Sequence, residues 1–224
     1  MAGSDQPAAE RGHKDTDDGG SRSRHPSGCC AERQLHDPAG RIGPHRRVVT
    51  LYLEAPEPIR SHIQANIAAE TLVLGTPGIE GVVLRYGFLY GEGTAIGPGG
   101  EWATGVKSGD VPIVGEGAGR YPFVHVRDAV SATVQAVDRG SPGIYNVVGD
   151  EPAPQAEWLP YLAEILDAPP PRRVSEEEAE EQIGAQAVYY GTQLRAASNA
   201  KAKSELGLTL EYPSWREGFR ELFG

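Results

Sequence analysis

The stretch VVLRYGFLYGEGT, residues 82–94, decides how the rest of the sequence is interpreted. Its first half is a short apolar run, which is typical of a buried strand. Its second half is a loop with aromatic and glycine residues, and the chain stays rich in glycine up to residue 100. In open α/β sheets, loops that leave the carboxyl ends of strands border the ligand site. We therefore predict a buried strand that ends in a functional loop.

The bulk composition fits a globular protein of one large or two small domains. Of the 224 residues, 39% are hydrophobic and 23% are charged, and the net charge is −10. Nucleic acids and anionic membranes bind clustered cations, so this acidic chain predicts neither as a partner. No apolar run is long enough for a transmembrane helix, and the first residues lack the apolar segment of a secretory signal. We expect a cytoplasmic protein.

Residues 1–48 differ from the remainder of the chain. They are rich in Ser, Arg, Gly, Asp and His and have no apolar periodicity, which predicts a disordered or non-native N-terminal segment. The same bias is typical of GC-rich DNA read out of frame, so a shifted or truncated upstream reading frame is one hypothesis for this segment. Cys29 and Cys30 are adjacent, and no metal-ligand spacing surrounds them, so we predict neither a structural disulfide nor a metal site.

From residue 49 onward, predicted strands alternate with predicted helices, which indicates the α/β class. Residues 59–75 have helical spacing and end at a glycine, and residues 121–140 form a strand that enters a helix, with Asp128 as its expected N-cap. His125, on this strand, is interpreted as a buried structural histidine rather than a catalytic one. Further elements are predicted at 143–150, 153–171, 175–185, 198–206 and 213–223.

Four blocks of sequence, taken in order, resemble one known family. They are VVLRYGFLYGEGT, VPIVGEGAGRYPFVHVRDAVSATVQAV, GIYNVVGDEP and SNAKAKSELGLTLEYPSWREGFRE. Their succession over residues 59–224 is similar to the C-terminal part of the NAD-dependent epimerase/dehydratase family, the extended short-chain dehydrogenases/reductases. The resemblance implies that residues 49–224 form an incomplete Rossmann-like, doubly wound sheet with a small C-terminal α/β substrate-binding lobe.

The resemblance also implies a set of site residues. The backbone of Tyr86, Gly87 and Phe88 is expected to face the nicotinamide of NAD or NADP. Arg120 is expected to contact a phosphate of a small-molecule substrate, and Tyr90 is assigned with it to substrate binding. Relatives often form homodimers through the helix that here spans residues 59–75, so a homodimer is a further expectation.

Two features of the family are missing from the sequence. No glycine-rich GxxGxxG turn, which would hold the dinucleotide pyrophosphate, occurs before residue 90. The family's Tyr-x-x-x-Lys pair is replaced by His62 and Asn66. A histidine can exchange protons near neutral pH, whereas an asparagine supplies no positive charge and can only hydrogen-bond a ribose hydroxyl. The alternative interpretation is that both are surface residues without chemistry.

Two functions therefore remain open. The first is an NAD(P)-dependent epimerase, dehydratase or reductase that acts on a nucleotide-sugar-like substrate, in a chain expected to be truncated. The second is a non-catalytic remnant of the family that serves as a binding or interaction module, whose exposed sheet edge would favour association.

Overall fold

The computed structural model describes residues 32–33, 50–51, 53 and 55–224. At its N-terminal side, β1 (Glu32–Arg33) pairs antiparallel with β2 (Thr50–Leu51). The other residues of the segment 1–48, with its four histidines and both cysteines, lie outside the described residues. The predicted division of the chain at residue 49 therefore stays a prediction.

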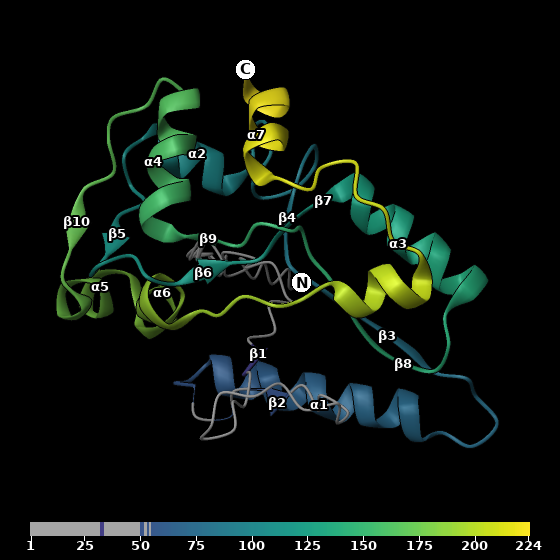
Figure 1. The fold of residues 1–224 in the computed structure, drawn as a ribbon. Coiled ribbons are helices and arrows are strands. Elements are labelled where there is room, and N and C mark those ends of the chain that lie inside the picture. The colour runs from purple at the N-terminus through teal and green to yellow at the C-terminus, as the bar shows by residue number, and fades with distance from the viewer. Residues whose placement is uncertain (1–31, 34–49, 52, 54) are drawn as a thin grey trace, which may run out of the picture.

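Parallel strands with a helix on each face form one end of the molecule, as Figure 1 shows. Strand β3 (Val82–Tyr86) pairs in parallel with β8 (Gly143–Val147). Helix α1 (Ile59–Gly75) lies on one side of this pair, and α3 (Val126–Arg139) lies on the other. Helices on both faces of parallel strands define a doubly wound arrangement. The predicted α/β class and the incomplete Rossmann-like sheet are confirmed.

A second group of elements continues from β4 (Phe88–Tyr90), which pairs in parallel with β7 (Phe123–His125). Three of its short strands are β5 (Ile113–Val114), β6 (Arg120–Tyr121) and β9 (Ala153–Pro154), and β6 pairs antiparallel with β9. The remaining elements are α2 (Glu101–Lys107), α4 (Gln155–Ile165), β10 (Arg173–Val174), which pairs with β5, α5 (Glu176–Ile183), α6 (Ala185–Val188), the π-helical turns η1 (Tyr189–Gln193) and η2 (Ala202–Leu206), and α7 (Trp215–Phe223).

Gly87 is the point at which the chain changes its strand partner. Its backbone N–H donates to the carbonyl of Val147 on β8 at 3.1 Å, and the next N–H, of Phe88, donates to the carbonyl of Pro122 at 2.8 Å. A Cβ atom at residue 87 would overlap the Pro122 carbonyl oxygen, so only glycine allows this approach. One continuous segment thereby joins the β3–β8 sheet to the β4–β7 pair.

The two largest buried clusters fill the two parts of the fold. The larger one contains the aromatic residues of the second group of elements, and Trp158, Trp215 and Phe219 lie in it. The smaller one packs β8 and α3 against η2. Phe123 and Val124, neighbours on β7, point into different clusters, because successive strand residues face opposite sides.

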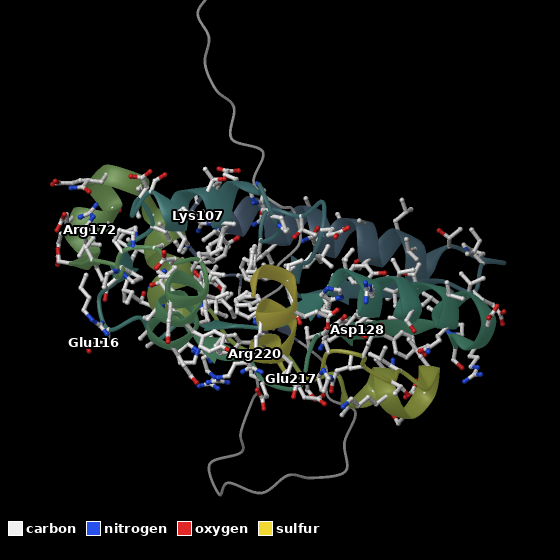
Figure 2. The ribbon with its side chains drawn as sticks, turned by 90° about the horizontal axis from the view of Figure 1, so that it is seen from above. Lys107, Glu116, Asp128, Arg172, Glu217 and Arg220 are labelled. Atoms are coloured by element: carbon white, nitrogen blue, oxygen red, sulfur yellow. The ribbon has the colours of Figure 1, made fainter. Side chains whose placement is uncertain are left out.

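The prediction that Asp128 caps α3 is wrong. The helix begins at Val126, and its cap is His125, whose Nδ1 accepts a hydrogen bond from the backbone N–H of Arg127 at 3.2 Å. Asp128 is buried and its carboxylate accepts the backbone N–H groups of Glu211 and Tyr212, at 2.7 and 3.1 Å. It therefore holds the C-terminal segment against α3. Figure 2 labels Asp128 on this helix.

Helix α1 is attached to the rest of the fold through two buried isoleucines and one ion pair. Only Ile59 and Ile63 of this helix are buried. Arg85 on β3 donates from Nε and Nη2 to the two carboxylate oxygens of Glu70, at 2.7 and 2.6 Å. The two side chains are 6% and 12% exposed, so little solvent weakens the pair. Within the described part of the chain, no helix is both long and apolar enough to cross a lipid bilayer.

We predict that Gly87→Ala destabilises the protein by about 3 kcal/mol, because the added methyl group would clash with the backbone carbonyl of Pro122. Urea unfolding followed by tryptophan fluorescence measures the change. Gly75→Ala is the matched control, because a Cβ there meets nothing within 4 Å. The control should be neutral or slightly stabilising, as alanine favours helix. Equal stability of the two variants would contradict the partner change at Gly87.

We also predict that Arg85→Met costs about 3 kcal/mol, because it leaves the Glu70 carboxylate buried without a partner. The double variant Glu70→Gln/Arg85→Met should recover most of that loss, since no charge is left behind. Arg60→Met is the control, as Arg60 and Glu57 form an ion pair that is 45% and 52% exposed. Its cost should be below about 1 kcal/mol. A double variant as unstable as the single one would refute the electrostatic explanation.

Candidate functional site

The residues predicted to face the nicotinamide lie at the carboxyl end of β3, but their side chains serve the fold. The hydroxyl of Tyr86 lies 2.5 Å from the hydroxyl of Thr133 on α3. The ring of Phe88 is buried among the rings of Trp102, Tyr121 and other aromatic residues. What this segment can present to a ligand is therefore mainly backbone at the edge of the sheet.

His62 and Asn66 lie toward the same edge of the sheet. Helix α1 runs antiparallel to β3, since Gly81 lies against Val73 and Arg85 binds Glu70. His62 is two turns before Glu70, about 12 Å further along the axis, and therefore beyond the end of β3. It is exposed, whereas Asn66 is half-buried. Residues four apart share a helix face, so the two side chains lie next to each other.

Tyr90 lies in the core. It is 1% exposed, and its ring packs edge-on against Phe219 of α7 and against His125. Gly218 of α7 leaves the room for this ring, because a Cβ there would overlap the tyrosine. Burial, followed by the charge of Asp128, raises the pKa of Tyr90. Its buried hydroxyl has no hydrogen-bond partner among the described residues, and Tyr90 lines neither of the two cavities described below.

Arg120 lies on an open cavity of about 380 Å³, which we call the arginine cavity. A second cation, Arg195, lies on it as well, and sequence reasoning missed this residue because no motif surrounds it. The other lining residues come from the end of η1 and from the segments before β6 and after η1: Ala118, Thr192, Gln193, Leu194 and Ala196. The backbone N–H of Arg120 donates to the carbonyl of Leu194 at 2.8 Å, which keeps the two walls together.

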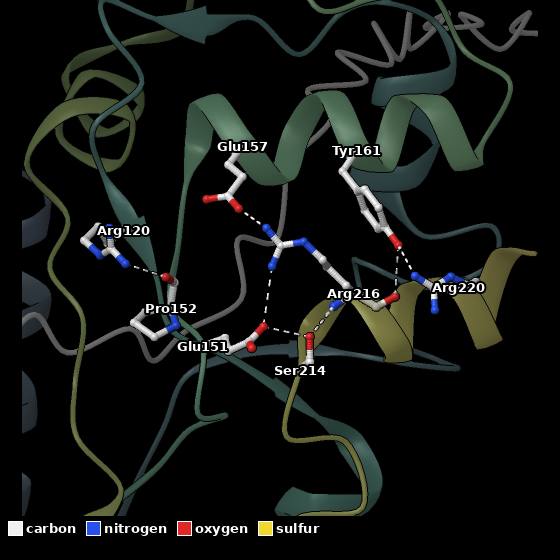
Figure 3. A network of polar contacts seen from close by, with 8 residues as sticks. All are labelled: Arg120, Glu151, Pro152, Glu157, Tyr161, Ser214, Arg216 and Arg220. Atoms are coloured by element: carbon white, nitrogen blue, oxygen red, sulfur yellow. Dashed lines mark hydrogen bonds and ion pairs between the residues drawn. The ribbon is translucent and has the colours of Figure 1, made fainter.

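The guanidinium of Arg120 is held by the chain beside β9. Its Nη2 donates to the carbonyl of Pro152 at 2.8 Å, as Figure 3 shows. The neighbouring Glu151 accepts the Ser214 hydroxyl at 2.8 Å and lies 3.4 Å from Arg216 of α7, which also binds Glu157 of α4. Residues 214–216, themselves tied to α4, thereby hold the loop that supports Arg120.

His125 serves as a helix cap and a core residue rather than as an exposed base. Its ring lies 4.0 Å from the ring of Tyr212, centre to centre, and the residue is buried. Desolvation by this burial lowers the pKa of His125, and Arg127 adds to the effect, although Asp128 opposes it. The imidazole therefore stays neutral, which it must do for Nδ1 to accept the Arg127 N–H.

The geometry and the comparisons agree on the class of protein, a Rossmann-like α/β fold. Residues 42–148 match the sequence model of the NAD dependent epimerase/dehydratase family. A curated protein, 3-diazoavenalumate denitrifying reductase of Streptomyces sp, is 40% identical over 168 residues, which are 75% of this chain and 55% of that protein.

Solved structures show the same fold. A functionally unknown conserved protein from Silicibacter pomeroyi DSS has a TM-score of 0.61 and 27% identity, over 79% of this chain and 57% of its own. The dTDP-glucose 4,6-dehydratase DesIV from Streptomyces venezuelae, solved with NAD bound, has a TM-score of 0.60 and 19% identity, over 82% and 54%. The chain belongs to the NAD dependent epimerase/dehydratase family, and it spans about half the length of these relatives.

We predict that the protein loses stability in acid partly through His125. Because its pKa is lowered in the folded state, the unfolded chain takes up the proton first as the pH falls below about 6.5, the ordinary value for histidine. The contribution of the neutral His125 to the stability of the folded protein is thus complete above that pH and is lost below it. His125→Asn keeps a side chain that can cap the helix but does not titrate, so its stability should fall less between pH 7 and pH 5.5.

Urea unfolding at several pH values measures this effect. The control is His62→Asn, which replaces an exposed histidine of α1 and should keep the pH dependence of the wild type. If His125→Asn also follows the wild-type curve, the neutral buried imidazole is not a source of the acid sensitivity.

Proposed function

We propose that the chain is the substrate-binding portion of an NAD(P)-dependent reductase or epimerase whose small-molecule substrate is nucleotide-sugar-like. The observation that carries the proposal is the pair of guanidinium groups, Arg120 and Arg195, on one open cavity. Nothing anionic lines that cavity among the described residues. Two cations without a neighbouring carboxylate suit a doubly charged group such as a diphosphate.

The hydrogen bonds of Arg120 support the same role. A guanidinium has five N–H donors, and the hydrogen bond to the carbonyl of Pro152 uses one of them. A carbonyl orients the group without neutralising its charge. Arg120 therefore keeps both its charge and donors for a phosphate oxygen, and the fixed orientation lowers the entropy lost on binding.

NAD or NADP is the cofactor that family membership implies, and the described residues fit one end of it. His62 and Asn66 share a helix face at the carboxyl edge of β3, where an exchangeable proton and an amide are placed side by side. When bound, the nicotinamide would supply or accept a hydride. His62 would give or take the proton of the substrate oxygen, and Asn66 would hydrogen-bond a ribose hydroxyl. No glycine-rich turn for the pyrophosphate precedes residue 90 in the sequence.

A second candidate, a non-catalytic interaction module, is favoured by exposed apolar side chains on the two helices that cover the β3–β8 pair. Leu72 of α1 is 71% exposed, and Val137 of α3 is 84% exposed. Val130 and Val134 extend the apolar stripe on α3, at helical spacing. Such stripes are typical of surfaces that are covered by other polypeptide.

We predict that Arg120→Gln and Arg195→Gln each weaken the binding of uridine diphosphate by about tenfold or more, because each removes a charge-assisted hydrogen bond. Isothermal titration calorimetry measures the dissociation constants. Arg172→Gln is the control, since Arg172 pairs with Glu178 away from the cavity, and it should leave the affinity unchanged.

Thermal shift with millimolar NAD(H) and NADP(H) separates the two candidate functions. A rise in melting temperature that is smaller in His62→Ala supports the reductase or epimerase. If the chain binds diphosphate but neither NAD(H) nor NADP(H) raises its melting temperature, the interaction module is favoured. Diphosphate binding that is insensitive to both arginines would show that the arginine cavity is not the substrate site.

A further inference from the structure

A second cavity, of about 160 Å³, lies close to the arginine cavity but has a different chemical lining. Three aromatic side chains line it, those of Trp102, Tyr121 and Tyr190. Two glutamine side chains and five valine, proline, isoleucine or alanine residues complete its wall. None of the ten lining residues is charged. We call this cavity the aromatic slot.

The two cavities share their dividing wall. Arg120 and Tyr121 are successive residues of β6, and successive strand residues face opposite sides. Arg120 accordingly lines the arginine cavity, and Tyr121 lines the aromatic slot. The turn η1 divides in the same way, with Tyr190 on the slot and Thr192 on the arginine cavity. The slot is therefore a separate site with its own chemistry.

The aromatic walls are held in place by other rings. The indole of Trp102 stacks on that of Trp158, with centroids 5.7 Å apart and an angle of 22°. Tyr121 packs edge-on against both indoles, at 6.1 Å from Trp102 and 5.0 Å from Trp158. Phe88 supports Tyr190 from behind at 5.6 Å. Rings fixed in this way present preformed faces and edges to a ligand, so little order is lost on binding.

The polar groups of the slot are mostly engaged by the protein itself. The side-chain oxygen of Gln155 accepts the backbone N–H of Val114 at 2.9 Å, and its amide donates to the carbonyl of Pro112 at 3.3 Å. The amide of Gln186 donates to the hydroxyl of Tyr190 at 3.1 Å. A charged ligand would lose its hydration here without gaining an opposite charge.

We propose that the aromatic slot binds a single uncharged, six-membered aromatic ring of a small molecule. An apolar cavity of roughly 150 Å³ holds one benzene molecule, so the volume of the slot suits one ring. Aromatic walls favour a ring in edge-to-face or offset contact. A nucleobase suits the slot less well, because both ends of Gln155 are already used and a base carries several groups that need partners. The inference does not rest on the proposed function of the arginine cavity.

The test measures the binding of 4-fluorophenol to the full chain by fluorine NMR. Ala187→Phe fills the slot from α6 and should weaken binding at least tenfold. Ala196→Phe is the matched control, since Ala196 lines the arginine cavity, and it should change the dissociation constant less than twofold. Ile183→Glu places a charge at an exposed lining position and should also weaken binding, which keeps the test valid if Ala187→Phe does not fold.

The proposal is overturned if 4-fluorophenol does not bind at millimolar concentration, or if the slot variants and Ala196→Phe weaken it equally. It is also overturned if uracil displaces the phenol and binds more tightly, since the site would then select a nucleobase. Parallel titration with pyrophosphate distinguishes the two sites. Loss of pyrophosphate binding in Arg120→Gln with unchanged phenol binding tests the arginine cavity alone, and the reverse pattern in Ala187→Phe tests the slot alone.

Discussion

The close passage of the backbone at Gly87 past the carbonyl of Pro122 is the constraint on which the architecture depends. It lets one segment pair with β8 through residues 82–86 and with β7 through residues 88–90, without an intervening loop. The doubly wound part and the second group of elements are therefore joined by continuous strand rather than by a linker. This direct connection fixes the position of the carboxyl edge of β3 relative to β6, and thus relative to both cavities.

The C-terminal segment packs against the elements that follow Gly87. The Asp128 carboxylate holds residues 211 and 212 against α3, and α7 then lays Gly218 on the ring of Tyr90. From the same helix, Arg216 reaches Glu151 and Glu157 beside the support of Arg120. Residues distant in sequence thereby act on one loop. The acidic and basic side chains here orient backbone rather than carry out chemistry.

Local patterns in the sequence predicted the alternating elements, since burial periodicity and glycine stops need only neighbouring residues. They failed where a side chain has a distant partner. Asp128 looked like a cap, yet its carboxylate is taken by residues more than eighty positions away, and His125 caps instead. Arg195 was missed because only the fold brings it to Arg120. The family resemblance assigns Tyr90 to substrate binding, and this stays a prediction; the structure shows that its side chain is buried under α7.

The contrast between the two cavities follows from a single geometric rule. Strand β6 is two residues long, and its alternation sends one side chain to each side. A cation and an aromatic ring at these two positions therefore create unlike surfaces only one residue apart in the chain. The backbone of the dividing wall is held by Leu194 and by β9. A ligand in either cavity therefore contacts the same strand, β6. Exchanging either side chain would alter the chemistry of one cavity while leaving the pairing that forms the wall.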